Sequence, residues 1–102
     1  MEVQIFGRQN CGKCSSIKHK VEHLIQKLGL GTAATMAFFD MDTADGMAEG
    51  AFYDVHEIPT TIIKENGRDL VRWDGEVPDV LELSRYFAAE RQAGPARVEN
   101  AC

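Results

Sequence analysis

The sequence has no long apolar run, no basic stripe and only three cysteines, and each shortage narrows its range of functions. A membrane-spanning helix needs about 20 consecutive apolar residues, and no segment approaches that length. The first residues lead into a strand-like segment without the apolar region of a signal peptide, so we expect a cytoplasmic protein that does not bind membranes. The net charge is −5, which argues against a nucleic-acid partner.

The chain of 102 residues has the length of one domain, which can bury a core without disulfide bonds. The cysteines are therefore not needed as scaffolding. We expect residues 1–90 to form this domain, residues 91–102 to form a flexible tail, and the protein to be a monomer. Cys102 in that tail is an incidental thiol, a third redox cysteine or a link between two copies.

Hydrophobic periodicity predicts an α/β chain whose elements follow the order β-α-β-α-β-β-α. Strands are expected at residues 3–6, 36–41, 60–64 and 69–73, and helices at residues 12–28, 43–55 and 78–89. The Asn66-Gly67 pair predicts a hairpin between the last two strands. A strand, crossover helix and second strand indicate a parallel pair. The expected architecture is therefore a four-stranded mixed sheet flanked by three helices.

Local signals also predict how the helices begin, end and pack. Thr43 or Asp42 is expected to cap the second helix, Gly29 to end the first, and Pro78 to occupy the first turn of the last. The side chains expected on the inner side of the second helix are Met47, Ala51, Phe52 and Val55. Those expected to point partly inward from the last helix are Val80, Leu81, Ser84 and Phe87.

The strongest chemical signal is the Cys11-Gly12-Lys13-Cys14 motif at the start of the first helix. A helix N-terminus presents free N–H groups and a partial positive charge, which favour a thiolate over a thiol. Thiols in such motifs have pKa values of roughly 3.5–7.5 instead of about 8.5. Lys13 and Arg8 act in the same direction. Helical geometry places Cys14 on the core face with Ile17, so Cys11 is the accessible nucleophile and Cys14 the protected, resolving thiol.

Two other interpretations of the cysteine pair stay open. One is a metal-binding module, either a zinc site completed by His19 and His23 or a copper-binding Cys pair. On a continuous helix both histidines point away from the thiols, and the expected second helix does not fit the ferredoxin-like order of copper-binding Cys-pair proteins. The other is a module that senses oxidation without turnover. An inert local disulfide adds little to a domain of this size.

The Ile58-Pro59-Thr60 segment opens the third strand. Its proline is either an ordinary strand-entry residue or a cis-proline beside the cysteine pair, because X–Pro bonds alone adopt cis at low cost. A cis turn would expose the backbone of Ile58 near Cys11, where an extended substrate segment could add a β-type contact.

Three segments carry a resemblance to a known family. The run from Val55 to Thr60, followed by Asn66-Gly67, resembles the cis-proline strand and hairpin of the thioredoxin superfamily. Ile5-Phe6-Gly7-Arg8 with its cysteine motif is similar to the start of glutaredoxins, and the segment Trp73–Asp79 resembles the Trp-x-Gly-x-x-Pro-Asp segment of NrdH-type redoxins. The resemblance implies a thioredoxin-like fold, a nucleophilic Cys11, a resolving Cys14 and a cis Pro59.

The function implied is that of a thiol–disulfide oxidoreductase that reduces protein disulfides or donates electrons. We expect the catalytic residues to be Cys11, Cys14 and Pro59, and the substrate-binding residues to be Arg8, Gly12, Lys13, Ile58 and Thr60. No metal or organic cofactor is needed, although glutathione stays open as a co-substrate. The inter-cysteine pair is Gly-Lys instead of the Pro-Tyr of glutaredoxins, which favours a thioredoxin-reductase-like enzyme over glutathione as the reductant.

Two further side chains near these motifs have competing interpretations. Trp73 is a packing residue at the hairpin end or a flank of the redox site, and we favour packing. His56 is a charge at a helix end or a proton carrier near the cysteines, and we favour the charge.

Overall fold

A computed structural model describes residues 1–31 and 33–92 of the chain. Its elements are β1 (Glu2–Gly7), α1 (Gly12–Lys27), β2 (Thr35–Asp40), α2 (Ala44–Phe52), β3 (Thr60–Glu65), β4 (Arg68–Asp74) and α3 (Val80–Gln92). The predicted order β-α-β-α-β-β-α is confirmed. Of the predicted tail, residues 91 and 92 belong to α3, and residues 93–102, with Cys102, lie outside the described residues.

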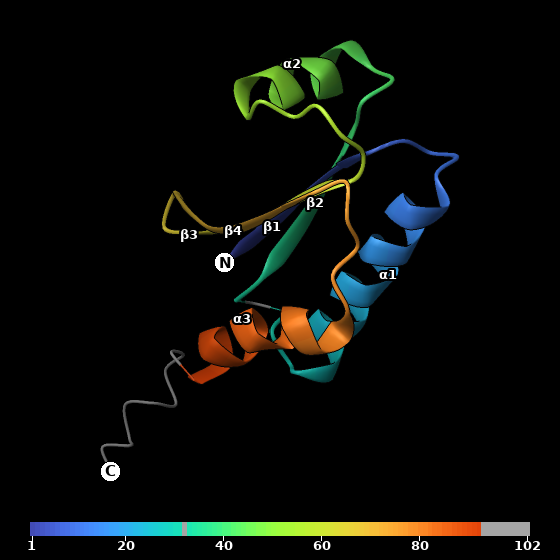
Figure 1. Cartoon of the computed structure of the whole chain (residues 1–102). Coiled ribbons are helices and arrows are strands. Elements are labelled where there is room, and N and C mark those ends of the chain that lie inside the picture. Colours follow the sequence, from blue (N-terminus) through green and yellow to red (C-terminus); the bar gives the residue numbers. More distant parts are fainter. Residues whose placement is uncertain (32, 93–102) are drawn as a thin grey trace.

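The four strands form one mixed sheet in the order β2-β1-β3-β4. Strand β1 pairs parallel with β2 and antiparallel with β3, which pairs antiparallel with β4. Helices α1 and α3 cover one face and α2 covers the other (Figure 1). This is the predicted α/β, thioredoxin-like arrangement. No helix within the described residues is long and apolar enough to span a membrane.

The main core lies between the sheet and helices α1 and α3. Side chains at alternate strand positions point to this face, because strand residues have a period of two. They meet the apolar stripe of α1 and two residues of α3. The fully buried members are Val3, Ile5, Ile17, Val21, Ile63, Leu83 and Phe87.

Helix α3 differs from the sequence-based prediction in its start and in its buried face. The side chain of Asp79 accepts a hydrogen bond of 2.8 Å from the Glu82 N–H, so Asp79 caps the helix and Pro78 precedes it. Leu81 is 77% exposed, whereas Leu83 is buried beside Phe87. Val80 is 41% exposed, and the expectation that Leu81 points partly inward was wrong.

Helix α2 packs on the opposite face through glycines, and its predicted inner side was also wrong. Met47 and Phe52 are 53% and 79% exposed, and the residues that α2 buries are Gly46 and Gly50. A Cβ at position 46 would overlap the backbone carbonyl of Asp40, so only glycine permits this close approach. The cap itself is as predicted, because the Thr43 hydroxyl accepts from the Gly46 N–H at 3.0 Å.

The β3–β4 hairpin turns at the predicted Asn66-Gly67 pair, whose φ angles of 54° and 80° suit a two-residue turn. A bulge follows, because Lys64 pairs with Asp69 but Ile63 pairs with Val71. Leu70 is therefore the extra residue of β4. The Lys64 Nζ lies 2.8 Å from the Asp69 carboxylate, and this hydrogen bond raises the pKa of Lys64.

The close approach of α2 gives a stability prediction. Gly46→Ala should lower the free energy of unfolding by about 1–3 kcal/mol, because the new methyl group meets rigid backbone. Gly50→Ala should cost less, since its Cβ would meet the flexible end of the Met41 side chain at 2.5 Å and alanine favours the helix.

Urea unfolding followed by circular dichroism measures both values. Gly31→Ala is the matched control, because nothing lies within 4 Å of a Cβ built there. If Gly46→Ala proved as stable as Gly31→Ala, this description of the contact between α2 and Asp40 would be wrong.

Candidate active site

The ends of two adjacent strands place the cysteine motif and the proline at one edge of the sheet. Phe6, the last residue of β1 that pairs with β3, lies opposite Thr60, the first residue of β3. The chain continues from β1 through a short loop into Cys11, and Pro59 directly precedes Thr60. Because these strands are antiparallel, two loops emerge at the same end of the sheet: the cysteine loop, residues 8–11, and the proline loop, residues 53–59.

Cys11 is the N-cap residue of α1. Its backbone is extended, with φ −126° and ψ 115°, and its carbonyl accepts a 3.0 Å hydrogen bond from the Ser15 N–H. Its Sγ accepts a 3.1 Å hydrogen bond from the Cys14 N–H. The first turn contains no acidic residue, so no carboxylate there opposes the partial positive charge of the helix start.

Cys14 lies one turn into the helix and forms a disulfide bond with Cys11. Cys14 is 1% exposed, whereas Cys11 is partly exposed, which is the difference in burial that helical geometry predicted. Gly7 makes room for the inner sulfur, because a Cβ at position 7 would lie 2.6 Å from the Cys14 Sγ. The buried sulfur therefore rests against the end of β1.

The Ile58–Pro59 peptide bond is cis. Pro59 is fully buried, and its carbonyl accepts a 2.8 Å hydrogen bond from the Gly75 N–H beyond the end of β4. Ile58 is half-buried. Thr60 is fully buried, and its hydroxyl donates to the Glu57 carbonyl at 2.7 Å. The side chain of Thr60 thus contacts the proline loop itself.

The remaining predicted substrate-binding residues lie on the surface around the cysteines. Gly12 and Lys13 are exposed in the first turn of α1. Arg8 is exposed in the preceding loop, where its Nε lies 3.0 Å from the Asp42 carboxylate. This ion pair offsets the charge of Arg8. Lys13, between the two cysteines, has no ion-pair partner among the described residues.

The other side chains considered from the sequence have clear places in the structure. Trp73 is 7% exposed, packs edge-to-face on Tyr86 and donates from Nε1 to Glu82 at 3.0 Å, so the favoured interpretation of a packing residue is confirmed. His56 is exposed and lies 2.9 Å from the Asp54 carboxylate. His19 and His23 are exposed on the side of α1 away from the core.

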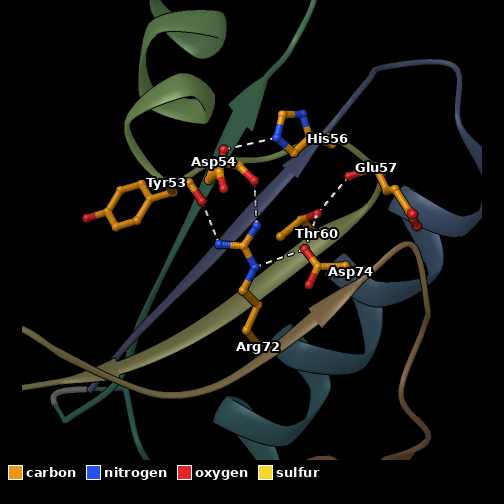
Figure 2. Close-up of polar contacts among 7 residues, drawn as sticks. All are labelled: Tyr53, Asp54, His56, Glu57, Thr60, Arg72 and Asp74. Carbon is orange, nitrogen blue, oxygen red and sulfur yellow. Dashed lines mark hydrogen bonds and ion pairs between the residues drawn. The ribbon is translucent and has the colours of Figure 1, made fainter.

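Sequence analysis missed the residues that hold the proline loop in place. Figure 2 shows the Arg72 side chain reaching from β4 to backbone carbonyls of the α2–β3 connection. Alternation along β4 could have signalled it, because a buried Trp73 places Arg72 on the opposite face of the sheet. No local pattern shows which loop that face meets.

Comparisons with known proteins agree with this geometry. The family described as a thioredoxin domain matches residues 1–88. No curated protein matches the sequence.

Solved thioredoxin structures resemble the chain over most of its length. Thioredoxin from Fasciola hepatica is 26% identical with a TM-score of 0.66, and the match covers 87% of this chain and 79% of that one. Thioredoxin 1 from Thermosipho africanus is 17% identical with a TM-score of 0.67, over 87% and 97% of the two chains. A mutant thioredoxin from Halobacterium salinarum is 22% identical with a TM-score of 0.72, over 92% and 77%.

The family match spans the sheet, the cysteine motif and the cis-proline loop. Together with a cysteine pair at disulfide distance, the fold supports a role in thiol–disulfide redox chemistry. The resemblance to the thioredoxin superfamily drawn from the sequence is confirmed, and the chain belongs to the thioredoxin domain family.

Proposed function

We propose that this protein is a thiol–disulfide oxidoreductase that reduces disulfide bonds of other proteins. The observation that carries the proposal is the unequal burial of two disulfide-bonded cysteines at a helix N-terminus. Thiol exchange needs one sulfur that a partner can reach and a second that is held close but protected. Cys11 and Cys14 meet these two needs.

The first step is attack by the Cys11 thiolate on one sulfur of a substrate disulfide. A bond forms between Cys11 Sγ and that sulfur, the substrate S–S bond breaks, and the other substrate sulfur leaves as a thiolate. The N-cap position favours this attack, because the Cys14 N–H already points at Cys11 Sγ. A hydrogen bond to the charged form stabilises a thiolate.

The second step is attack by Cys14, as the thiolate after its thiol has lost its proton to solvent, on Cys11 Sγ. The Cys11–Cys14 bond forms, the mixed disulfide breaks, and the second substrate sulfur leaves as a thiolate. Two electrons pass from the protein to the substrate, and each released substrate thiolate takes a proton from solvent at neutral pH. The disulfide between Cys11 and Cys14 in the structure corresponds to the product of this step.

The peptide before Pro59 supplies a place for the substrate chain. Ile58 is half-buried at the edge of the sheet where the cysteine loop emerges. An extended segment with a disulfide could pair with this backbone and bring its sulfur to Cys11. Exposed Gly12 and Lys13 would form the opposite wall, with Arg8 beyond them.

The reductant that resets the pair is the next part of the proposal. Trp73 is buried in the core, so it is not an aromatic wall for a small peptide such as glutathione. The Gly-Lys pair between the cysteines supplies no aromatic ring either. We therefore favour a thioredoxin-reductase-like enzyme of the cytoplasm over glutathione, with no resident cofactor.

The cysteine pair also permits a second function, that of a metal-binding or redox-sensing module. Metal analysis of protein purified under reducing conditions tests the metal-binding module, because stoichiometric zinc or copper would support it over the oxidoreductase. A sensor would have an oxidisable pair with negligible turnover.

The nucleophile is tested by Cys11→Ser in a Cys102→Ser background, which removes the third thiol. Reduction of a disulfide-bonded protein in the presence of dithiothreitol should fall to the uncatalysed rate, because a serine hydroxyl is not ionised at neutral pH. The Cys102→Ser protein alone is the control. Full activity in Cys11→Ser would rule out this nucleophile.

The resolving role is tested by Cys14→Ser in the same background. The first step should proceed and the second should fail, so the protein should accumulate as a covalent adduct with its substrate. Non-reducing electrophoresis and mass spectrometry would detect that adduct, and a reductant should release it. Failure to form this adduct, with the substrate reduced as fast as by the Cys102→Ser control, would contradict the mechanism.

The reductant is tested by supplying NADPH with a thioredoxin reductase, or NADPH with glutathione and glutathione reductase, to the same oxidised protein. NADPH consumption in the presence of a disulfide-bonded protein should be faster in the first system. A faster rate with glutathione would reverse the assignment.

A further inference from the structure

One side chain of β4 holds the segment that leads to the cis-proline. The Arg72 guanidinium donates from Nη2 to the Asp54 carbonyl at 2.9 Å and from Nη1 to the Tyr53 carbonyl. Its Nε donates to the Asp74 carboxylate at 2.9 Å (Figure 2). The planar guanidinium can make these contacts together because its donors form a rigid fork.

The end of the same loop, from Glu57 to Pro59, is held by groups of β3 and of the residue after β4. The Thr60 hydroxyl donates to the Glu57 carbonyl and lies 3.4 Å from the Asp74 carboxylate (Figure 2). The Gly75 N–H donates to the Pro59 carbonyl. Asp74 therefore contacts both Arg72 and Thr60. The loop is held by Arg72 of β4 before Ile58 and by the Gly75 N–H, just beyond β4, after it.

The start of the loop is held by two sets of contacts: the N–H groups of Asp54 and Val55 donate to the Ala51 and Gly50 carbonyls of α2 at 3.1 and 2.7 Å, and the carbonyls of this start are held by Arg72. Asp54 has a φ of 59°, which lies in the left-handed region that a non-glycine residue adopts only at a cost in free energy. Arg72 binds the carbonyl of that residue and of the one before it. Without the guanidinium, water would satisfy both carbonyls and the backbone could relax to other conformations.

The consequence concerns long substrates. A protein segment that pairs with the Ile58 backbone needs that peptide to be ordered before binding, or binding must supply the ordering free energy. A small disulfide needs only the Cys11 sulfur. Disorder in the loop should therefore weaken binding of protein disulfides and leave the reaction with small disulfides unchanged.

We propose that Arg72 is a positioning residue for protein substrates, which holds the segment from Tyr53 to Ile58 in the conformation that receives an extended chain. The inference rests on the proposed function and adds to it a residue that distinguishes a protein disulfide from a small one. Arg72 acts through the loop and does not touch the reacting sulfurs.

The test compares Arg72→Met and Arg72→Lys with Arg68→Met. Arg68 lies on the same strand, is exposed, and has no side-chain hydrogen bond or ion pair within the described residues. Arg72→Met keeps an apolar stem and removes all donors. Arg72→Lys keeps the charge but cannot hold two carbonyls in the same plane.

Each variant is assayed with a disulfide-bonded protein and with a small aromatic disulfide. For Arg72→Met the KM for the protein substrate should rise about fivefold to tenfold, which is the loss expected when an ordered loop must be re-ordered on binding. The rate constant with the small disulfide should stay within about twofold of the wild type, and Arg72→Lys should give an intermediate KM. Arg68→Met should match the wild type with both substrates.

Amide hydrogen exchange adds a readout of the loop itself. Exchange in the segment between Tyr53 and Ile58 should accelerate in Arg72→Met while exchange in α1 is unchanged. If Arg72→Met does not fold, Arg72→Lys carries the same comparison.

The outcomes separate this inference from the proposed function. An active wild type, with Arg72 variants that keep the protein KM or lose activity equally on both substrates, would overturn the positioning role alone. A wild type that reduces neither substrate would overturn the proposed function and this inference with it.

Discussion

The pairing of β1 with β3 is the constraint on which the rest of the site depends. Strand β1 lies inside the sheet with partners on both sides, so neither its register nor its direction can change without breaking two ladders. That register sets Phe6 opposite Thr60 and brings two loops to one edge. The cysteine loop and the proline loop are distant in sequence and become neighbours only through this ladder.

The helices attach to this frame in two different ways. Helix α1 buries Ile17, Val21 and Leu24 against the sheet, and the same stripe carries Cys14 inward. Helix α2 leaves its large apolar side chains, Met47 and Phe52, exposed, and it lies against the sheet through its glycines instead. Large side chains orient α1 and its cysteine, whereas close backbone contact fixes α2 and the start of the proline loop.

The sequence predicted most of the fold because its local signals agree with one another. Periodicity gave α1 and the burial of Cys14, and Asn66-Gly67 gave the hairpin. The inner face of α2 was predicted wrongly, because Met47 and Phe52 are apolar by type and yet exposed. Apolar periodicity assumes that a helix packs through large side chains, and this assumption fails where two glycines face the sheet.

The motifs of the candidate site are visible in the sequence, but the contacts that support the proline loop are not. Cys11, Cys14 and Pro59 belong to the two strongest local motifs of the chain. Arg72, in contrast, binds carbonyls that lie almost twenty residues earlier in the chain. Only the pairing of β3 with β4 and the path of the α2–β3 connection bring these groups together. No local sequence pattern shows that these residues, far apart in the chain, are in contact.

The bulge at Leu70 has a consequence for both faces of β4. A two-residue turn without an extra residue would set Thr61 opposite Arg72 and Thr60 opposite Trp73, one position out of phase with the pairing observed. The indole would then leave the core shared with α3, and the guanidinium would be buried there without its carbonyl partners. A single inserted residue thus decides which side of the strand builds the interior and which side holds the proline loop.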